Sequence, residues 1–326
     1  MSLMDWRAER DRALLLLERE KSPPARADAA DLLFQLAAEE PARAPEFAGV
    51  LTRLLADAQG EVRRAGLGLA TLVLPREELV DTLAARLTDP DVGARLEAVG
   101  RLADLSLPEI RGALAPVLQD AVPEVRFEAA RGMASLKHSA GLEVLVDALD
   151  NESLRFRALG ALAELEDPRA LPAVKRLFRR WLLSPFERTQ AAGVLAKLGD
   201  AEGVEWLVKR LQKRWSTDRA LAVELCGEVK VPGALERLKA ILDAPKDPCR
   251  GAAARGLGRL GEPAALPWLL ALLDDVSAPE DFRLDAAEGL WRLGLPEAQA
   301  RVRAAAASFT SPEAREEIAE LLQETP

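Results

Sequence analysis

Side chains that commonly carry out catalysis are scarce in this sequence of 326 residues. It has one histidine, His138, and two cysteines, Cys226 and Cys249, neither of which belongs to a C-x-x-C pair. Zinc and di-iron sites usually need several imidazoles, and disulfide frameworks or thiolate sites need grouped cysteines. The sequence therefore predicts no metal site, no cofactor and no disulfide framework.

The sequence offers little support for nucleophilic catalysis. Cys249 precedes Arg250 near an expected helix start, a setting that can lower a thiol pKa, but it has no histidine nearby in the sequence. His138 and Ser139 are adjacent, yet one such pair is not a catalytic triad. Residues 256–261 read GLGRLG and match the dinucleotide-binding pattern only formally, because no strand is expected before them. We therefore expect no catalytic residue and no enzymatic activity.

Two basic octets are the most conspicuous charged feature. VKRLFRRW occupies residues 174–181 and VKRLQKRW occupies residues 208–215. Helical spacing predicts that Val174, Leu177, Phe178 and Trp181, with Val208, Leu211 and Trp215 in the second copy, point inward. The cations would then form one exposed basic patch, consisting of Lys175, Arg176, Arg179, Arg180, Lys209, Arg210, Lys213 and Arg214.

The basic patch has a functional and a structural interpretation. Residues 172–219 contain eleven Lys or Arg and five Asp or Glu, a net charge of +6, although the whole chain carries -9. Such a local field can steer an acidic or phosphorylated partner. Charged runs on amphipathic helices also often serve solubility alone. Nucleic acid is a weaker alternative, because a duplex binder is more often basic overall.

The octets lie between copies of a motif that recurs along the chain, R-x-x-A-[AV]-x-x-L-[AG]-x-L. Clear copies occupy residues 126–136, 155–165, 188–198, 250–260 and 283–293, and weaker copies start at Arg26, Arg64, Arg95, Arg219 and Arg315. Steps of 29 to 38 residues between these anchor arginines are typical of a solenoid, in which one repeat cannot bury its apolar face alone.

Each repeat reads as a pair of helices. In residues 188–198 the apolar side chains recur at helical spacing. Gly or Pro then ends the helix before a second amphipathic segment begins. The predicted fold is an all-α, armadillo-like α-solenoid of about ten helix pairs, forming one domain over residues 1–326. Residues 1–21 and 312–326 are expected to be capping helices, and residues 22–311 the repeats.

The repeat resembles that of HEAT-repeat proteins, in the short-repeat subtype seen in phycobilisome-lyase-like proteins. The resemblance rests on the anchor Arg, the following A-[AV] pair, the Leu spacing and a preceding Asp. It implies HEAT-type helix pairs and a series of Asp–Arg hydrogen bonds, for which Asp89–Arg95 and Asp120–Arg126 fit best. We expect this series to break near Arg188 and Arg219, where the Asp is absent or displaced.

The second helices of the pairs are expected to line the concave side. Leu96, Phe127 and Phe156 each follow an anchor Arg and would form an apolar row there. Such a row is either a groove for a partner helix or peptide, or packing between repeats. The polar candidates beside it are Glu97, Glu128 and Arg131.

These observations favour a non-enzymatic protein-binding scaffold or adaptor that uses the concave face and the basic patch. The alternatives are a nucleic-acid-binding module and, from the HEAT resemblance, a lyase-like or chaperone-like protein. No apolar run approaches the length of a membrane span, so we expect a cytoplasmic protein.

The basic patch yields a prediction. Charge reversal at Lys175, Arg179, Lys209 and Lys213 weakens partner binding without lowering the melting temperature, because these side chains are expected on the solvent side of their helices. Binding is measured at low salt, where surface electrostatics are strongest. Unchanged binding would contradict a role for the patch.

Overall fold

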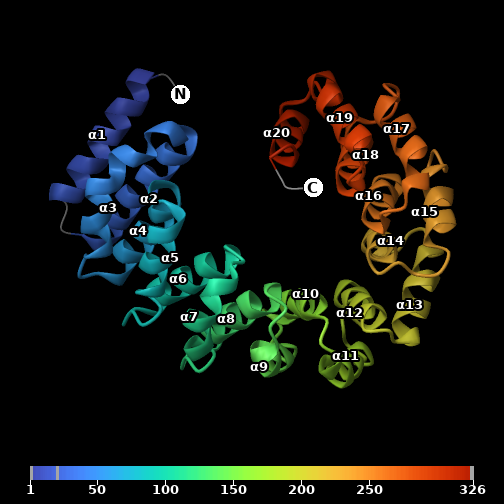
Figure 1. Ribbon diagram of the computed structural model, residues 1–326, viewed down its shortest axis with the longest axis horizontal. Coiled ribbons are helices and arrows are strands. Elements are labelled where there is room, and N and C mark those ends of the chain that lie inside the picture. Colours follow the sequence, from blue (N-terminus) through green and yellow to red (C-terminus); the bar gives the residue numbers. More distant parts are fainter. Residues whose placement is uncertain (1–2, 20–21, 324–326) are drawn as a thin grey trace. The chain divides into compact units, whose positions relative to one another are not determined.

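A computed structural model describes residues 3–19 and 22–323 as an all-α solenoid (Figure 1). Within these residues there are twenty α-helices, short 3-10 helices and no strand, which confirms the predicted fold class and the number of pairs. The chain divides into two compact units, residues 1–150 and 151–326. The prediction of one continuous domain stays a prediction.

Unit 1 contains four helix pairs followed by a ninth helix. Its α-helices are α1 (Leu3–Arg19), α2 (Pro23–Glu39), α3 (Ala48–Leu55), α4 (Gly60–Val73), α5 (Arg76–Ala84), α6 (Val92–Asp104), α7 (Arg111–Val117), α8 (Pro123–Ser135) and α9 (Leu142–Ala148). Between α2 and α3 the residues Pro41–Phe47 form a 3-10 helix that leads into α3.

Unit 2 contains one helix followed by five pairs. Its α-helices are α10 (Arg155–Leu165), α11 (Leu171–Phe178), α12 (Pro185–Lys197), α13 (Ala201–Leu211), α14 (Arg219–Glu228), α15 (Ala234–Leu242), α16 (Arg250–Leu260), α17 (Leu266–Asp274), α18 (Glu280–Leu293), α19 (Pro296–Ala305) and α20 (Pro312–Leu321). The segments predicted to be capping helices are occupied by α1 and α20. No helix among the described residues combines the length and the apolar character needed to cross a bilayer.

Local sequence signals set the helix ends. Ser184 and Glu187 form a capping box at the start of α12, and Pro185 occupies its first turn. Gly261 and Gly294 end α16 and α18 with φ of 75° and 73°, a left-handed conformation that glycine adopts without strain. These are the stop signals that divide the repeat into two helices.

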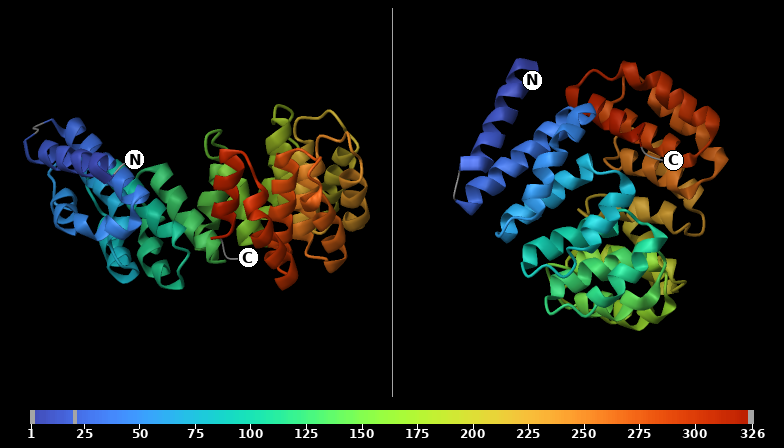
Figure 2. Two further views of the ribbon diagram at one scale, coloured as in Figure 1. Left: turned by 90° about the horizontal axis from the view of Figure 1, so that it is seen from above. Right: turned by 60° about the vertical axis from the view of Figure 1, so that its left-hand side comes forward.

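The helices of each unit form an inner and an outer layer, with the even-numbered helices inside (Figures 1 and 2). Neighbouring inner helices of unit 2 approach very closely, because glycines face each other across the contact. A Cβ atom at Gly227 would overlap the carbonyl oxygen of Gly256 on the next inner helix, and one at Gly258 would overlap that of Gly289. The core around these contacts consists mainly of Ala and Leu.

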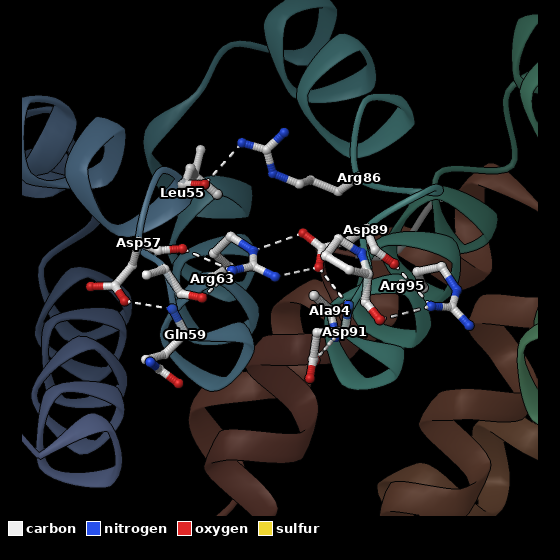
Figure 3. Close-up of polar contacts among 11 residues, drawn as sticks. Leu55, Asp57, Gln59, Arg63, Arg86, Asp89, Asp91, Ala94 and Arg95 are labelled. Atoms are coloured by element: carbon white, nitrogen blue, oxygen red, sulfur yellow. Dashed lines mark hydrogen bonds and ion pairs between the residues drawn. The ribbon is translucent and has the colours of Figure 1, made fainter.

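Arginines at the starts of inner helices connect one repeat to the next, and we call this series the arginine ladder (Figure 3). Arg63 on α4 donates from Nε to the Asp89 carboxylate at 2.7 Å and from Nη1 to the Asp57 carbonyl at 2.8 Å. Arg95 on α6 donates in the same way to the Asp120 carboxylate at 2.8 Å and to the Asp89 carbonyl at 2.9 Å. Each arginine thus contacts the loop before its own helix and the equivalent loop of the following repeat.

The ladder corrects two details of the prediction. The ladder residue in the second copy is Arg63 rather than Arg64, which is exposed. The predicted pairs Asp89–Arg95 and Asp120–Arg126 do form, but through the backbone carbonyls of the aspartates, at 2.9 and 2.7 Å. The carboxylate of each aspartate faces the arginine of the preceding repeat, as it does for Asp89.

The predicted interruption at Arg219 is wrong. Arg219 is buried and makes a two-pronged contact with the Asp247 carboxylate at 2.6 and 2.9 Å. Arg188 behaves as expected, since it donates hydrogen bonds to the carbonyls of Arg180 and Trp181 rather than to an aspartate. Beside it, Thr189 instead donates to the Asp218 carboxylate at 2.5 Å, so a neutral side chain takes the place of the arginine there.

Ladder carboxylates have lowered pKa values. Hydrogen bonds from Arg63, joined by the Asp91 N–H, outweigh burial and lower the pKa of Asp89. Burial is the largest influence on Asp120 and would raise its pKa, but Arg95 and the Val122 N–H together lower it. A carboxylate with a lowered folded-state pKa stabilises the fold above its unfolded pKa, and this contribution is lost as the pH falls through the folded-state pKa.

We therefore predict that Asp89→Asn lowers the free energy of unfolding by about 3 kcal/mol at neutral pH, because Arg63 loses a buried charged partner. The deficit should shrink below the ordinary aspartate pKa of 3.8, where protonation removes the same charge from the native protein. Urea unfolding across this pH range measures both effects. Asp81→Asn, an exposed position on α5, is the control and should change stability by less than about 0.5 kcal/mol. A deficit independent of pH would contradict this account.

Candidate protein-binding surfaces

The surroundings of the two cysteines do not activate their thiols. Cys226 is fully buried in α14, and burial raises its pKa to about 12. Burial also raises the pKa of Cys249, at the start of α16, despite the nearby Arg219. His138 is exposed in unit 1, where its Nδ1 accepts a hydrogen bond from the Ala140 N–H at 3.3 Å. Neither thiol is therefore poised to act as a thiolate nucleophile.

The predicted basic patch lies in unit 2, and much of its charge is neutralised within the chain. Four of its eight cations lie close to carboxylates: Lys175 at 2.7 Å from Asp200, Arg179 at 2.8 Å from Glu202, Lys209 at 3.3 Å from Glu205, and Arg210 at 2.8 Å from Asp218. The pKa of Glu202 is accordingly lowered, chiefly by its hydrogen bond with Arg179. The field outside the patch is weaker than the sequence count of cations suggests.

The remaining patch cations have other surroundings. Within the part of the chain that the structure describes, Arg176 and Lys213 are exposed and make no ion pair. Arg214 donates to the Lys246 carbonyl at 2.7 Å, and Arg180 is half-buried. Reversing Lys175 or Arg179 therefore also removes an ion pair, whereas reversing Lys213 removes charge alone.

The predicted direction of the two tryptophans in the octets is wrong. Val174, Leu177, Phe178 and Leu211 are buried as predicted, and Val208 is half-buried. Trp181 and Trp215, predicted to point inward, are instead 90% and 83% exposed. The reason is that α11 ends at residue 178 and α13 at residue 211, so both tryptophans lie in turns where helical spacing no longer holds.

Leu182, next to Trp181, is 87% exposed. We call Trp181, Leu182 and Trp215 the tryptophan edge. The indole that does pack in this region is that of Trp206, which meets Phe178 edge-on at 5.4 Å between ring centroids.

The predicted apolar row of the concave side is not present as an exposed surface. Phe127 on α8 is fully buried, Leu96 on α6 is half-buried, and Phe156 on α10 in unit 2 is 48% exposed. The position after an anchor arginine can thus face a neighbouring helix rather than solvent, as it does at Phe127. This correction removes the row as a candidate groove.

The polar residues predicted beside that row mainly contact each other. Glu97 pairs with Arg101 at 2.8 Å. Glu128 is buried and pairs with Arg131 at 2.8 Å, and Arg131 also reaches Asp104 at 2.7 Å. These ion pairs stabilise the inner surface of unit 1 and leave little unsatisfied polarity there.

A hollow on the inner face of unit 2 was missed by the sequence analysis. It has a volume of about 270 Å³ and lies among α10, α12, α14 and α16. Gly160 and Gly193 form part of its wall, together with apolar side chains, and a Cβ atom at Gly160 would meet nothing within 4 Å. The lining residues are Gly160, Ala163, Glu164, Gln190, Gly193, Val194, Lys197, Leu221, Leu225, Glu228, Val229 and Arg259.

The charged rim of this inner hollow is fixed by ion pairs. Lys197 lies 3.5 Å from both Glu166 and Glu228, and Arg259 lies 2.9 Å from Glu224. The signal that could have revealed the hollow is the residue five positions after each anchor arginine. Glycine stands there after Arg95, Arg155 and Arg188, whereas the copies that start at Arg126, Arg219, Arg250, Arg283 and Arg315 carry Arg or Glu. In unit 2 the two successive glycines are therefore the sequence signal for the hollow.

Two further hollows differ from the inner hollow in their walls: one has mainly charged side chains, and the other contains a pair of the arginine ladder. One of about 300 Å³ lies between α18 and α20 and is lined mainly by charged side chains, including Asp285, Glu288, Glu317 and Glu320. One of about 580 Å³ in unit 1 contains the Arg95–Asp120 pair of the arginine ladder in its wall.

Comparison with known proteins identifies the repeat. The sequence model for HEAT repeats matches residues 80–154, 112–183 and 212–280, which together exceed half of the chain. No curated protein sequence matches the chain.

Three solved structures show similarity at low identity. The complex of CpcE and CpcF of phycocyanin lyase from Nostoc sp. PCC7120 is 20% identical, with a TM-score of 0.47, over 74% of this chain and 93% of that chain. Kap121p is 13% identical, with a TM-score of 0.43, over 98% of this chain and 41% of that chain. Human deoxyhypusine hydroxylase is 21% identical, with a TM-score of 0.32, over 76% of this chain and 95% of that chain.

Two glycines of the inner face should respond in opposite ways to the same substitution. Gly160→Ala should raise the free energy of unfolding by about 1 kcal/mol, because an interior helix glycine is replaced without a clash. Gly227→Ala should lower it by about 2 kcal/mol or more, because the new methyl group overlaps the backbone of α16. Urea unfolding of the two variants measures both effects. Destabilisation by Gly160→Ala would show that the fold itself needs this glycine.

Proposed function

The chain belongs to the HEAT-repeat family, and from this premise we propose that it is a non-enzymatic scaffold that binds a protein partner on the inner face of unit 2. The observation that carries the proposal is the inner hollow at Gly160. The glycine weakens its helix, yet no packing contact within the described chain requires it. A partner atom that approaches the helix backbone closely would account for it.

Part of the wall of the inner hollow is apolar and suits an apolar anchor. Leu221 and Leu225 of α14, and Val229 just after that helix, line this part together with Ala163 of α10 and Val194 of α12. Protein interfaces gain much of their affinity from a few large side chains that fill such pockets. One Leu, Met or aromatic side chain from a partner helix is the kind of group that this space accepts.

The rim of the inner hollow supports the same proposal. Lys197 and Arg259 are held by carboxylates on neighbouring inner helices, so little side-chain freedom remains to be lost on binding. Both signs of charge are present, which suits a protein surface better than a phosphate backbone.

The other candidate functions receive less support. The basic patch contributes less than expected to an acidic-partner or nucleic-acid site, because four of its cations are already paired. A lyase-like or chaperone-like role would need a ligand in the inner hollow, and a chromophore retained during purification would favour it.

The test is partner capture from the native lysate with the tagged full chain, after nuclease treatment, read by mass spectrometry. Gly160→Leu should lower recovery of the partner about tenfold or more, since it fills the inner hollow. Gly112→Leu is the matched control. It places the same side chain on the outer helix α7, where a Cβ also meets nothing within 4 Å, and should leave recovery unchanged.

Equal recovery with Gly160→Leu and wild type would reject the inner hollow as the contact. Recovery that vanishes with nuclease would instead support the nucleic-acid alternative. Thermal unfolding of both variants confirms that they remain folded.

A further inference from the structure

The tryptophan edge is formed by two turns that occupy equivalent places in neighbouring repeats. Residues 179–184 connect α11 to α12, and residues 212–218 connect α13 to α14. Both turns lead from an outer helix to an inner helix, so they lie at the same edge of unit 2. Trp181, Leu182 and Trp215 are therefore presented on one side of the unit, each more than four-fifths exposed.

The backbones of these turns are firmly held. Arg188 donates to the Arg180 carbonyl at 2.5 Å and to the Trp181 carbonyl at 3.3 Å. The ends of the second turn are also joined, because the buried Arg219 just after it donates to the Leu211 carbonyl just before it at 2.7 Å. The apolar side chains thus project from ordered turns. Because they are exposed, they contribute no buried area to the stability of the unit.

Hydrogen bonds connect the second turn to its neighbours. Thr189, in α12, donates to Asp218 in the second turn at 2.5 Å. Arg214 in the second turn donates to the Lys246 carbonyl in the following turn at 2.7 Å. The second turn is thus joined to α12 and to the turn that follows it, and we call the three turns the strip.

The charge along this strip is positive. Lys213 and Lys246 are exposed and make no ion pair within the described part of the chain, and the Arg214 guanidinium lies 5.4 Å from the centroid of the Trp215 ring. Two carboxylates of these turns, Asp218 and Asp247, are buried against Arg210 and Arg219. The third, Asp243, is exposed and pairs with Lys239. Around the indoles of the first two turns, cations rather than carboxylates thus face the solvent.

We propose that the tryptophan edge docks unit 2 on an anionic lipid surface. Projecting side chains on turn tips insert readily into the soft interface of a bilayer, whereas a rigid partner would need a matching pocket for each one. Indole rings favour the headgroup level of a membrane, and Lys and Arg are attracted to anionic headgroups. None of the residues that line the inner hollow belongs to the tryptophan edge, so this docking is independent of the proposed scaffold function.

Val276 provides an internal comparison. It is 84% exposed in the turn between α17 and α18, which is equivalent to the two turns of the tryptophan edge. Its sequence neighbours Asp274 and Asp275 are exposed acids, so the same degree of apolar exposure occurs there in a negative setting. Anionic lipid should not attract this turn.

The test is co-sedimentation of the full chain with phosphatidylcholine vesicles, with and without phosphatidylserine, at low and raised salt. Wild type should bind only the phosphatidylserine vesicles, release at raised salt and shift its tryptophan emission to shorter wavelength on binding. Trp181→Ala/Leu182→Ala/Trp215→Ala should weaken binding at least about tenfold, and Val276→Ala should not.

A charge variant completes the test. Lys213→Glu/Arg214→Glu should also lose binding while the tryptophans remain, and Lys230→Glu, in a turn at the opposite edge, is its control. Failure of wild type to bind phosphatidylserine vesicles at low salt would overturn the proposal. Undiminished binding by the triple variant would overturn it as well. The proposal would also fail if the chain did not bind vesicles but captured a protein in a way that requires Trp181.

Discussion

The arginine ladder is the interaction on which the stacking of repeats depends. Each ladder arginine satisfies carbonyls of the loop before its own helix and, in the best-formed steps, a carboxylate of the next repeat, as Arg63 and Arg95 do. Only a planar guanidinium offers enough donors in a fixed geometry for both tasks. Because a buried charge without a partner is costly, the pairing also penalises any other spacing between neighbouring repeats.

Once the ladder sets this spacing, the inner helices of unit 2 are close enough for glycine to decide the shape of the surface between them. Gly227 and Gly258 are required because the next helix backbone occupies their side-chain space. Gly160 is different, since the space beside it is open and belongs to the inner hollow. Glycine is therefore required for helix packing at two positions and leaves open space beside the helix at a third.

The sequence could predict the helix pairs and the ladder because both recur. Ten weak signals at a regular step support one another, and an arginine that recurs at the same place in each copy is easily recognised. It could not predict that Arg219 reaches Asp247, since that contact depends on the shape of a loop one repeat further on. Nor could it place Trp181 and Trp215, because helical spacing predicts a direction only as long as the helix continues. Phe127 was misplaced for a related reason: the helical period does not say which side chains of an inner helix are covered by neighbouring repeats, and Phe127 is fully buried.

The most direct test of the account is a double-mutant cycle at Arg219 and Asp247, which belong to successive repeats and are both buried. Arg219→Met, Asp247→Asn and the double variant would be compared with wild type by urea unfolding. If the ladder couples neighbouring repeats, the two side chains should show an interaction energy of about 2 kcal/mol. Additive effects, with an interaction energy near zero, would contradict the ladder as the constraint that holds the repeats in place.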